Sequence, residues 1–175
     1  MAGFAARSWG LYCAFIGVIP YTSWMINQRA KTPCIGVCST GIGDRVCRGC
    51  KRFAHEVIQW NSYDAEGKAL INQRLADFLS QCTRNKLQVL DKVLLEQRLQ
   101  EQQIRYLPHQ DAYCWAYTLL KAGGSQISRA EDFGLQIDAE FRDTPLDELR
   151  RIIDDEFFVL SEAYYERYIG LGDTA

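Results

Sequence analysis

The sequence lacks most of the features that would assign it to a familiar class of protein. No stretch of its 175 residues reaches the ~18 uninterrupted apolar residues that a membrane-spanning helix needs. It has only two histidines, and neither has a local catalytic partner. Glu-x-x-His, Ser-His-Asp, Walker and dinucleotide-binding glycine motifs are missing. We therefore expect no membrane span, no evident small-molecule substrate, and a non-enzymatic role more than an enzymatic one.

Composition and charge are ordinary for a globular protein, but the charge is unevenly distributed. Hydrophobic residues make up 47% and charged residues 24%, which fits one domain or one small domain with an appendage. Residues 26–107 hold 13 Lys and Arg against 8 Asp and Glu, a net charge of +5, whereas residues 108–175 have a net charge of −8. The basic part could face nucleic acid or an acidic partner. The simpler interpretation is that the two parts attract each other.

The first residues read as a leader that is separate from the rest of the chain. Leu11 to Ile19 is an apolar run, and Arg7 is the only charge before Trp24. A start of translation at Met25, a signal or anchoring segment, and a genuine extra helix are the three interpretations. We favour the start at Met25, because a short polar lead-in to a cysteine cluster follows it.

Four of the seven cysteines fall within seventeen residues: Cys34, Cys38, Cys47 and Cys50. Their spacing is C-x3-C, eight residues, then C-x2-C. Two short pairs separated by a compact loop can wrap one metal ion, because each pair turns two thiolates to the same side. Glycines inside the pairs fit the tight backbone that such turns need. We therefore predict a single four-thiolate metal centre, with two disulfides or free thiols as the alternative.

Basic residues surround this cluster. The cysteines themselves indicate the cellular compartment and the candidate metals. Arg45, Arg48, Lys51 and Arg52 could stabilise thiolates or contact phosphates as in a zinc knuckle. Free thiolates and an odd cysteine count favour a reducing cytoplasm. The ligand set suits zinc or an iron–sulphur cluster, and chemistry alone favours zinc. Two function classes remain open: a metal-binding adaptor for a protein or RNA partner, and an iron–sulphur redox or electron-transfer protein.

Residues 32 to about 79 resemble the bacterial family called domain of unknown function 1289, the YdhL-like predicted Fe–S proteins. The matching text is Pro33-Cys34-x3-Cys38, Cys47-x-Gly-Cys50-x-Arg52, Glu56-x3-Trp60-Asn61 and a following helix with Lys68. The iron–sulphur label of that family is itself inferred from cysteines, and the resemblance implies no activity.

The rest of the chain predicts a mainly α-helical protein with an irregular four-cysteine module near its start. The domains are a leader (1–31), the module (32–62) and a helical region (63–175). Lys51 to Trp60 reads as a short helix with Trp60 as the core cap of the module. Base stacking on Trp60 is the lesser alternative.

Helix starts are expected at several capping residues in the helical region. Asp64 suits the N-cap of a helix over 65–81, with Leu70, Ile71, Leu75 and Phe78 inward. A helix over 84–104 is expected to follow. Residues 111–122 alternate like a strand at Tyr113, Trp115 and Tyr117, but end like a helix at two glycines, and we favour a helix. Ser128 and the Thr144-Pro145 pair suit later helix starts. The consecutive acids at 154–156 are expected on a solvated face.

Overall fold

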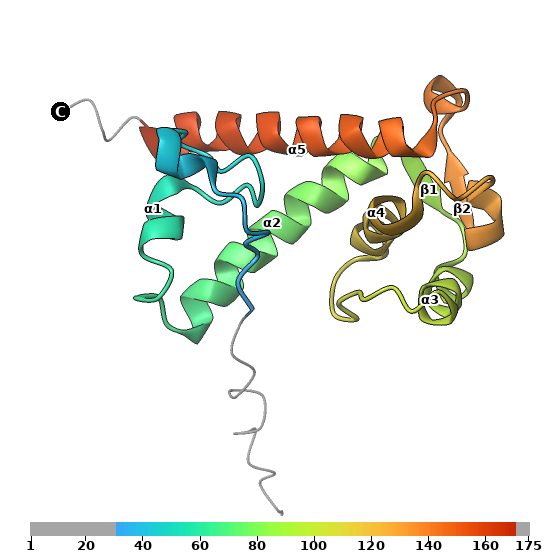
Figure 1. The fold of residues 1–175 in the computed structure, drawn as a ribbon, viewed down its shortest axis with the longest axis horizontal. Coiled ribbons are helices and arrows are strands. Elements are labelled where there is room, and N and C mark those ends of the chain that lie inside the picture. The colour runs from blue at the N-terminus through green and yellow to red at the C-terminus, as the bar shows by residue number, and fades with distance from the viewer. Residues whose placement is uncertain (1–30, 171–175) are drawn as a thin grey trace, which may run out of the picture.

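The computed structural model describes residues 31–170, and these are mainly helical, as the sequence predicted (Figure 1). The expectations for the first thirty residues, including a start at Met25, lie outside the described residues, as does Cys13. Within the described range no helix is long and apolar enough to cross a membrane.

Five helices and one small ribbon carry the fold. The helices are α1 (Ala54–Ile58), α2 (Ala65–Arg84), α3 (Lys92–Glu101), α4 (Ala112–Gly123) and α5 (Leu146–Tyr168). The antiparallel strands are β1 (Leu87–Val89) and β2 (Leu135–Ile137). Three short 3-10 turns join them: η1 (Ser39–Ile42), η2 (Ala130–Phe133) and η3 (Ala139–Phe141). Helix α5 runs along one side of the molecule, with the cysteine module at its C-terminal end and the ribbon at its N-terminal end (Figure 1).

Aspartates begin three of the helices through a shared local mechanism. The Asp64 side chain accepts from the Gly67 backbone N–H at 2.7 Å, which confirms the predicted cap of α2. Asp91 accepts from Leu94 at 2.9 Å, and Asp111 accepts from Tyr113 at 2.9 Å. Each carboxylate satisfies an N–H group that has no partner inside its helix.

The predicted helix over 84–104 is only partly present, because α3 covers residues 92–101 but not the start of that range. Helix α2 ends at Arg84, and the chain then forms β1, whose Leu87 pairs with Ile137 of β2. Leu87 and Leu135 are both buried, so pairing with a segment nearly fifty residues away overrides the local helix-forming pattern. Helix α3 begins only afterwards.

Two further predictions from the sequence need correction. Leu70 does not point inward, since it is 66% exposed on α2, whereas Ile71 and Leu75 are buried as predicted. Ser128 does not begin a helix: the 3-10 turn η2 starts at Ala130 after Arg129 and has no side-chain cap. The predicted start after Thr144-Pro145 is confirmed, because α5 begins at Leu146.

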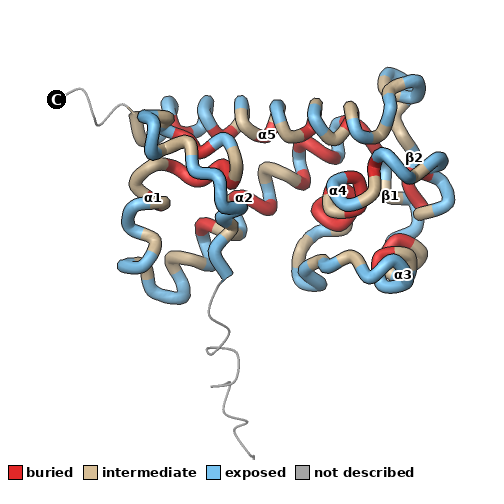
Figure 2. The backbone as a smooth tube through the Cα atoms, viewed as in Figure 1, coloured by how far each residue is buried: buried red, intermediate tan, exposed pale blue. Residues whose placement is uncertain are grey.

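The buried residues form one large core and one small one (Figure 2). The large core lies between α2, α4 and α5 and includes Leu119, Leu149 and Ile153. The small core joins Val46 and Phe53 of the cysteine module to Tyr165 of α5. The long helix therefore packs against both regions.

Candidate metal centre

The second cysteine pair sits on a tight hairpin. Val46 and Phe53 form an isolated antiparallel bridge. Between them, the Cys47 N–H donates to the Arg52 carbonyl and the Lys51 N–H donates to the Cys47 carbonyl, both at 2.8 Å. Lys51 has a φ of +59°, the left-handed conformation that closes such a turn. This backbone explains why the short helix begins at Ala54 and not at Lys51.

The turn surrounds the Cys47 sulfur with hydrogen-bond donors. Burial of Cys47 opposes its ionisation, but the backbone N–H groups of Cys50, Ser39 and Gly49, together with the Cys50 side chain, outweigh it and lower the pKa of Cys47 to about 7. A thiolate is the form that binds a metal. Ser39 follows Cys38, so donors from both cysteine segments converge on this one sulfur.

Arg52 is the basic residue that reaches a cysteine sulfur. Its Nε donates to Cys50 Sγ at 3.3 Å, and its guanidinium lies 4.7 Å above the Trp60 ring. Burial raises the pKa of Cys50 despite this hydrogen bond. Cys50 is therefore a thiol at neutral pH, and a metal ion that binds it would have to displace the proton.

The first pair lies on an open loop that packs against the hairpin. Cys34 and Cys38 are exposed; Cys34 Sγ accepts from the Gly36 N–H at 3.4 Å, and Cys38 Sγ lies 3.0 Å from Thr40 Oγ1. Gly36 has a φ of +92°, as expected for a turn between two ligands.

The two segments meet at Gly49. A Cβ built on Gly49 would lie 2.8 Å from the Val37 carbonyl oxygen, so only glycine allows this approach. The Arg48 N–H also donates to Ser39 Oγ at 2.9 Å, and Cys47 Sγ lies 3.8 Å from the Val37 carbonyl oxygen. A close backbone approach is therefore present at Gly49, whereas Gly36 has nothing within 4 Å of a built Cβ and instead has the positive φ.

The four sulfurs are not gathered into one coordination sphere. Among the described residues, no three or more His, Cys, Asp or Glu side chains are arranged to hold a metal ion. Cys47 and Cys50 lie together, and the exposed Cys34 and Cys38 lie on the adjoining loop. The chemistry of the donors fits a thiolate-binding metal: four cysteines, converging N–H groups and one arginine.

The other predicted basic residues have different roles. Arg48 pairs with Asp44 at 3.0 Å and lies 4.9 Å from the centre of the Phe158 ring. Lys51 points away from the sulfurs to Asp154, and Arg45 is exposed, with its carbonyl accepting from Ala54. The shared thiolate-stabilising role that the sequence suggested is therefore seen in contact only for Arg52.

Trp60 is half-buried against the large helical core, not the small core of the module. Two cations lie over its ring: the Arg52 guanidinium at 4.7 Å and the Lys68 ammonium group at 5.9 Å from the ring centre. Trp60 therefore packs on Arg52, the arginine that contacts Cys50. This cation–π contact holds Trp60 beside the module.

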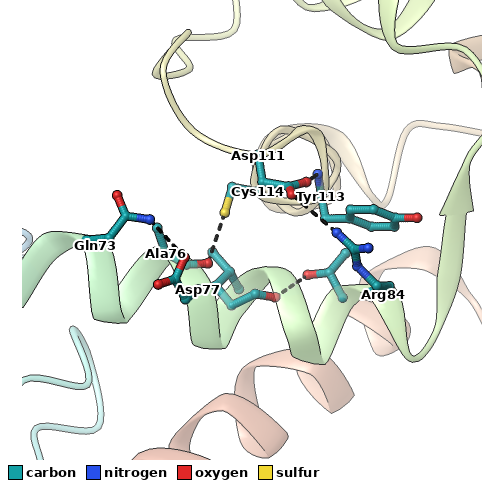
Figure 3. A network of polar contacts seen from close by, with 9 residues as sticks. Gln73, Ala76, Asp77, Arg84, Asp111, Tyr113 and Cys114 are labelled. Atoms are coloured by element: carbon teal, nitrogen blue, oxygen red, sulfur yellow. Dashed lines mark hydrogen bonds and ion pairs between the residues drawn. The ribbon is translucent and has the colours of Figure 1, made fainter.

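Two cysteines outside the cluster serve the helical core. Figure 3 shows Cys114 on α4 donating to the Ala76 carbonyl of α2 at 3.3 Å, next to the Arg84–Asp111 ion pair. Burial raises the pKa of Cys82 to about 11 and that of Cys114 to about 12. Both remain thiols at neutral pH.

No pattern in the sequence indicated the polar contacts that fix the module to the helices. Glu56 accepts from the Phe53 N–H at 2.9 Å and from Arg74 of α2 at 2.7 Å. Lys51 reaches Asp154 of α5. The acids at 154–156 were expected on a solvated face, but Asp154 and Glu156 each bind a buried lysine.

Comparison with known proteins supports the resemblance. Residues 32–79 match the family described as protein of unknown function (DUF1289). The match covers 48 of the 175 residues of the chain. The DUF1289 segment spans the hairpin, the first-pair loop, α1 and most of α2, so it contains every cysteine of the predicted centre. No curated protein and no solved structure matches the chain.

Proposed function

We propose that this protein binds one metal centre through Cys34, Cys38, Cys47 and Cys50. The observation that carries the proposal is the close approach of the two cysteine segments at Gly49, where the Arg48 N–H donates to Ser39 Oγ and a Cβ would lie 2.8 Å from the Val37 carbonyl oxygen. Two cysteine pairs on adjoining segments can supply four thiolates to one ion. Closing the loop of Cys34 and Cys38 over the hairpin would bring the other two thiolates to the same ion.

The small apolar content of the module also supports a bound metal. Its own core has two buried apolar residues, Val46 and Phe53, which pack on Tyr165. Fixing a backbone costs roughly 1–2 kcal/mol per residue. Metal ligation supplies on the order of 10 kcal/mol. A metal would therefore be the main source of order for the loop that carries Cys34 and Cys38.

A structural zinc adaptor is the function that we favour. Four cysteines without an open position are typical of structural zinc. Beside the first pair, Ile35, Val37 and Ile42 are exposed, the last at 87%. An ordered metal loop would present these apolar side chains, with Arg45 nearby in the chain, to a protein or RNA partner. No catalytic role is part of this proposal.

The alternative is an iron–sulphur centre that transfers electrons. One observation favours it: Arg52 Nη1 is one of two buried side-chain polar atoms in the described residues that have no hydrogen-bond partner. Arg52 already contacts Cys50, so a sulfide of a cluster held there would supply an acceptor. Sulfide hydrogen bonds are among the features that set the reduction potential of such centres.

The test is metal content after anaerobic purification of the full chain. We expect one equivalent of zinc per chain, and a loss of most of it in Cys47→Ser and Cys50→Ser. Cys82→Ser and Cys114→Ser are the matched controls and should keep it. Brown protein with stoichiometric iron would replace the adaptor with the redox alternative. Full metal retention in any cluster variant would refute the four-thiolate assignment.

A further inference from the structure

Lys51 combines an unfavourable backbone conformation with a buried charged side chain. It follows Cys50 directly and has a φ of +59°, a region where a residue with a Cβ costs roughly 1 kcal/mol. Its side chain is only 2% exposed. Glycine would close the same turn without strain, so the turn alone does not explain a lysine here.

The Lys51 ammonium group is held by α5 of the other region. Its Nζ donates to Asp154 Oδ1 of α5 at 2.6 Å and lies 5.5 Å from the centre of the Phe157 ring. The same Asp154 oxygen accepts from the Tyr117 hydroxyl of α4 at 2.9 Å. Three residues from the hairpin, α4 and α5 therefore share one polar contact, which we name the Lys51 lock.

We propose that the Lys51 lock couples metal binding to the packing of α4 and α5. This inference rests on the proposed metal function. The lock fixes the residue next to one predicted ligand, so breaking it at Asp154 frees the hairpin that carries Cys47 and Cys50. Thermodynamic linkage is reciprocal, so a bound metal stabilises the contact with α5 by the same factor.

A second lysine pair on α5 gives a matched comparison. Lys86, at the end of α2, binds Glu156, and its side chain is 11% exposed. Asp154 and Glu156 stand two residues apart and have the same exposure, 35%. Only Asp154 reaches the cysteine module. Glu156→Gln therefore reproduces the loss of a lysine ion pair on the same helix without touching the hairpin.

The experiment measures zinc affinity by competition with a chromophoric chelator for the wild type, Asp154→Asn, Lys51→Gly and Glu156→Gln. We expect affinity to fall by about ten-fold or more in Asp154→Asn and Lys51→Gly, within the usual range of coupling energies. Glu156→Gln should stay within about two-fold, because distant sites behave independently. The double variant of Lys51 and Asp154 should lose no more than either single variant, since both remove one interaction.

Lys51→Gly separates the two roles of the lysine. Glycine keeps the turn and removes the ammonium group, so an unchanged affinity would show that Lys51 only closes the turn and would overturn the lock. Equal losses in Asp154→Asn and Glu156→Gln would also overturn it, because the effect would then be general destabilisation of α5.

Amide exchange in metal-free protein keeps the lock distinct from the proposed function. Asp154→Asn should speed exchange at Cys47 and Lys51, whose N–H groups close the hairpin, whereas Glu156→Gln should not. If the wild type binds no zinc or iron, the metal function fails and this exchange difference still tests the lock. Unchanged exchange in Asp154→Asn would refute the lock whatever the metal result.

Discussion

The cysteine module and the helical region are held together by different forces. The helical region buries sixteen residues in one apolar core, which is enough to order its helices without a ligand. The module has a core of three buried residues, one of them supplied by α5, and is otherwise held by hydrogen bonds, ion pairs and cation–π contacts. One part of the chain is thus stabilised by burial, and the other relies on polar contacts and on its thiols.

The uneven charge of the chain fits the simpler interpretation, in which its basic and acidic parts attract each other. Lys51, Arg84 and Lys86 of the basic part pair with Asp154, Asp111 and Glu156 of the acidic part. The two parts attract each other within one molecule. A nucleic-acid surface is not needed to explain the excess of basic residues.

Thiol reactivity should separate the two regions most strongly. At pH 8 a thiol whose pKa is about 11, as for Cys82, is ionised in about one molecule in a thousand, and Cys114 is ionised still less. Cys34 and Cys38 are exposed. In metal-free protein, iodoacetamide should therefore label Cys34 and Cys38 first, with labelling of Cys82 and Cys114 rising only as the pH is raised or the fold opens. Peptide mass spectrometry would measure this order; early labelling of Cys114 would contradict the burial described for α4.

Truncation in the large core should cost more than any change in the module outside its cysteines. Leu149→Ala removes a fully buried side chain between α5 and its neighbours, and such changes cost about 2–5 kcal/mol. Urea unfolding followed by far-ultraviolet circular dichroism measures the loss. Val159→Ala on the exposed face of α5 is the control and should change stability little. Equal effects would mean that α5 does not bury the face described here.

Glu56 tests whether polar contacts stabilise the module. Glu56→Gln removes the charge that binds Arg74 and weakens the cap at Phe53, and a hydrogen bond to a charged group contributes about 1.5–3 kcal/mol. Glu148→Gln breaks an exposed pair with Arg151 and should cost at most about 1 kcal/mol. Denaturant midpoints of the two variants compare their losses of stability. A larger loss in Glu148→Gln than in Glu56→Gln would contradict a stabilising role for the Glu56 contacts.

The smallest expected effect is at the junction of the two regions. Asp64→Ala removes the side-chain cap of α2 and should cost about 1 kcal/mol. Asp64→Asn retains a capping oxygen and should cost less. Thermal unfolding of both variants tests the cap, and an alanine variant as stable as the asparagine variant would show that the Gly67 hydrogen bond contributes nothing.

Local signals in the sequence were sufficient for the starts of α2, α4 and α5 and for the position of the cysteine module. The Asp64 cap, the helix after Asp111 and the start after Pro145 depend on neighbouring residues, so a single sequence reveals them. The β1–β2 ribbon was missed because Leu87 and Ile137 become a strand pair only when distant segments meet. No local pattern marks such a meeting.

The residue types of the site could be predicted, but the long-range contacts that hold the cysteine module in place could not. Cysteine spacing and Gly49 indicated two turns that approach each other, and both turns are present. The contact from Arg52 to Cys50 follows from their nearness in the chain. The bond between Lys51 and Asp154 joins residues 103 positions apart, and only the packing of α5 against the hairpin brings them together.

The most direct test is amide exchange in the full chain with and without a strong chelator, with metal content measured in each sample. We expect that removing the metal strongly speeds exchange across residues 34–60, leaving only residual protection at the hairpin amides of Cys47 and Lys51, and that the amides of α2 and α4 stay protected. Unchanged protection across residues 34–60 in demonstrably metal-free protein would contradict a metal that orders the cysteine module.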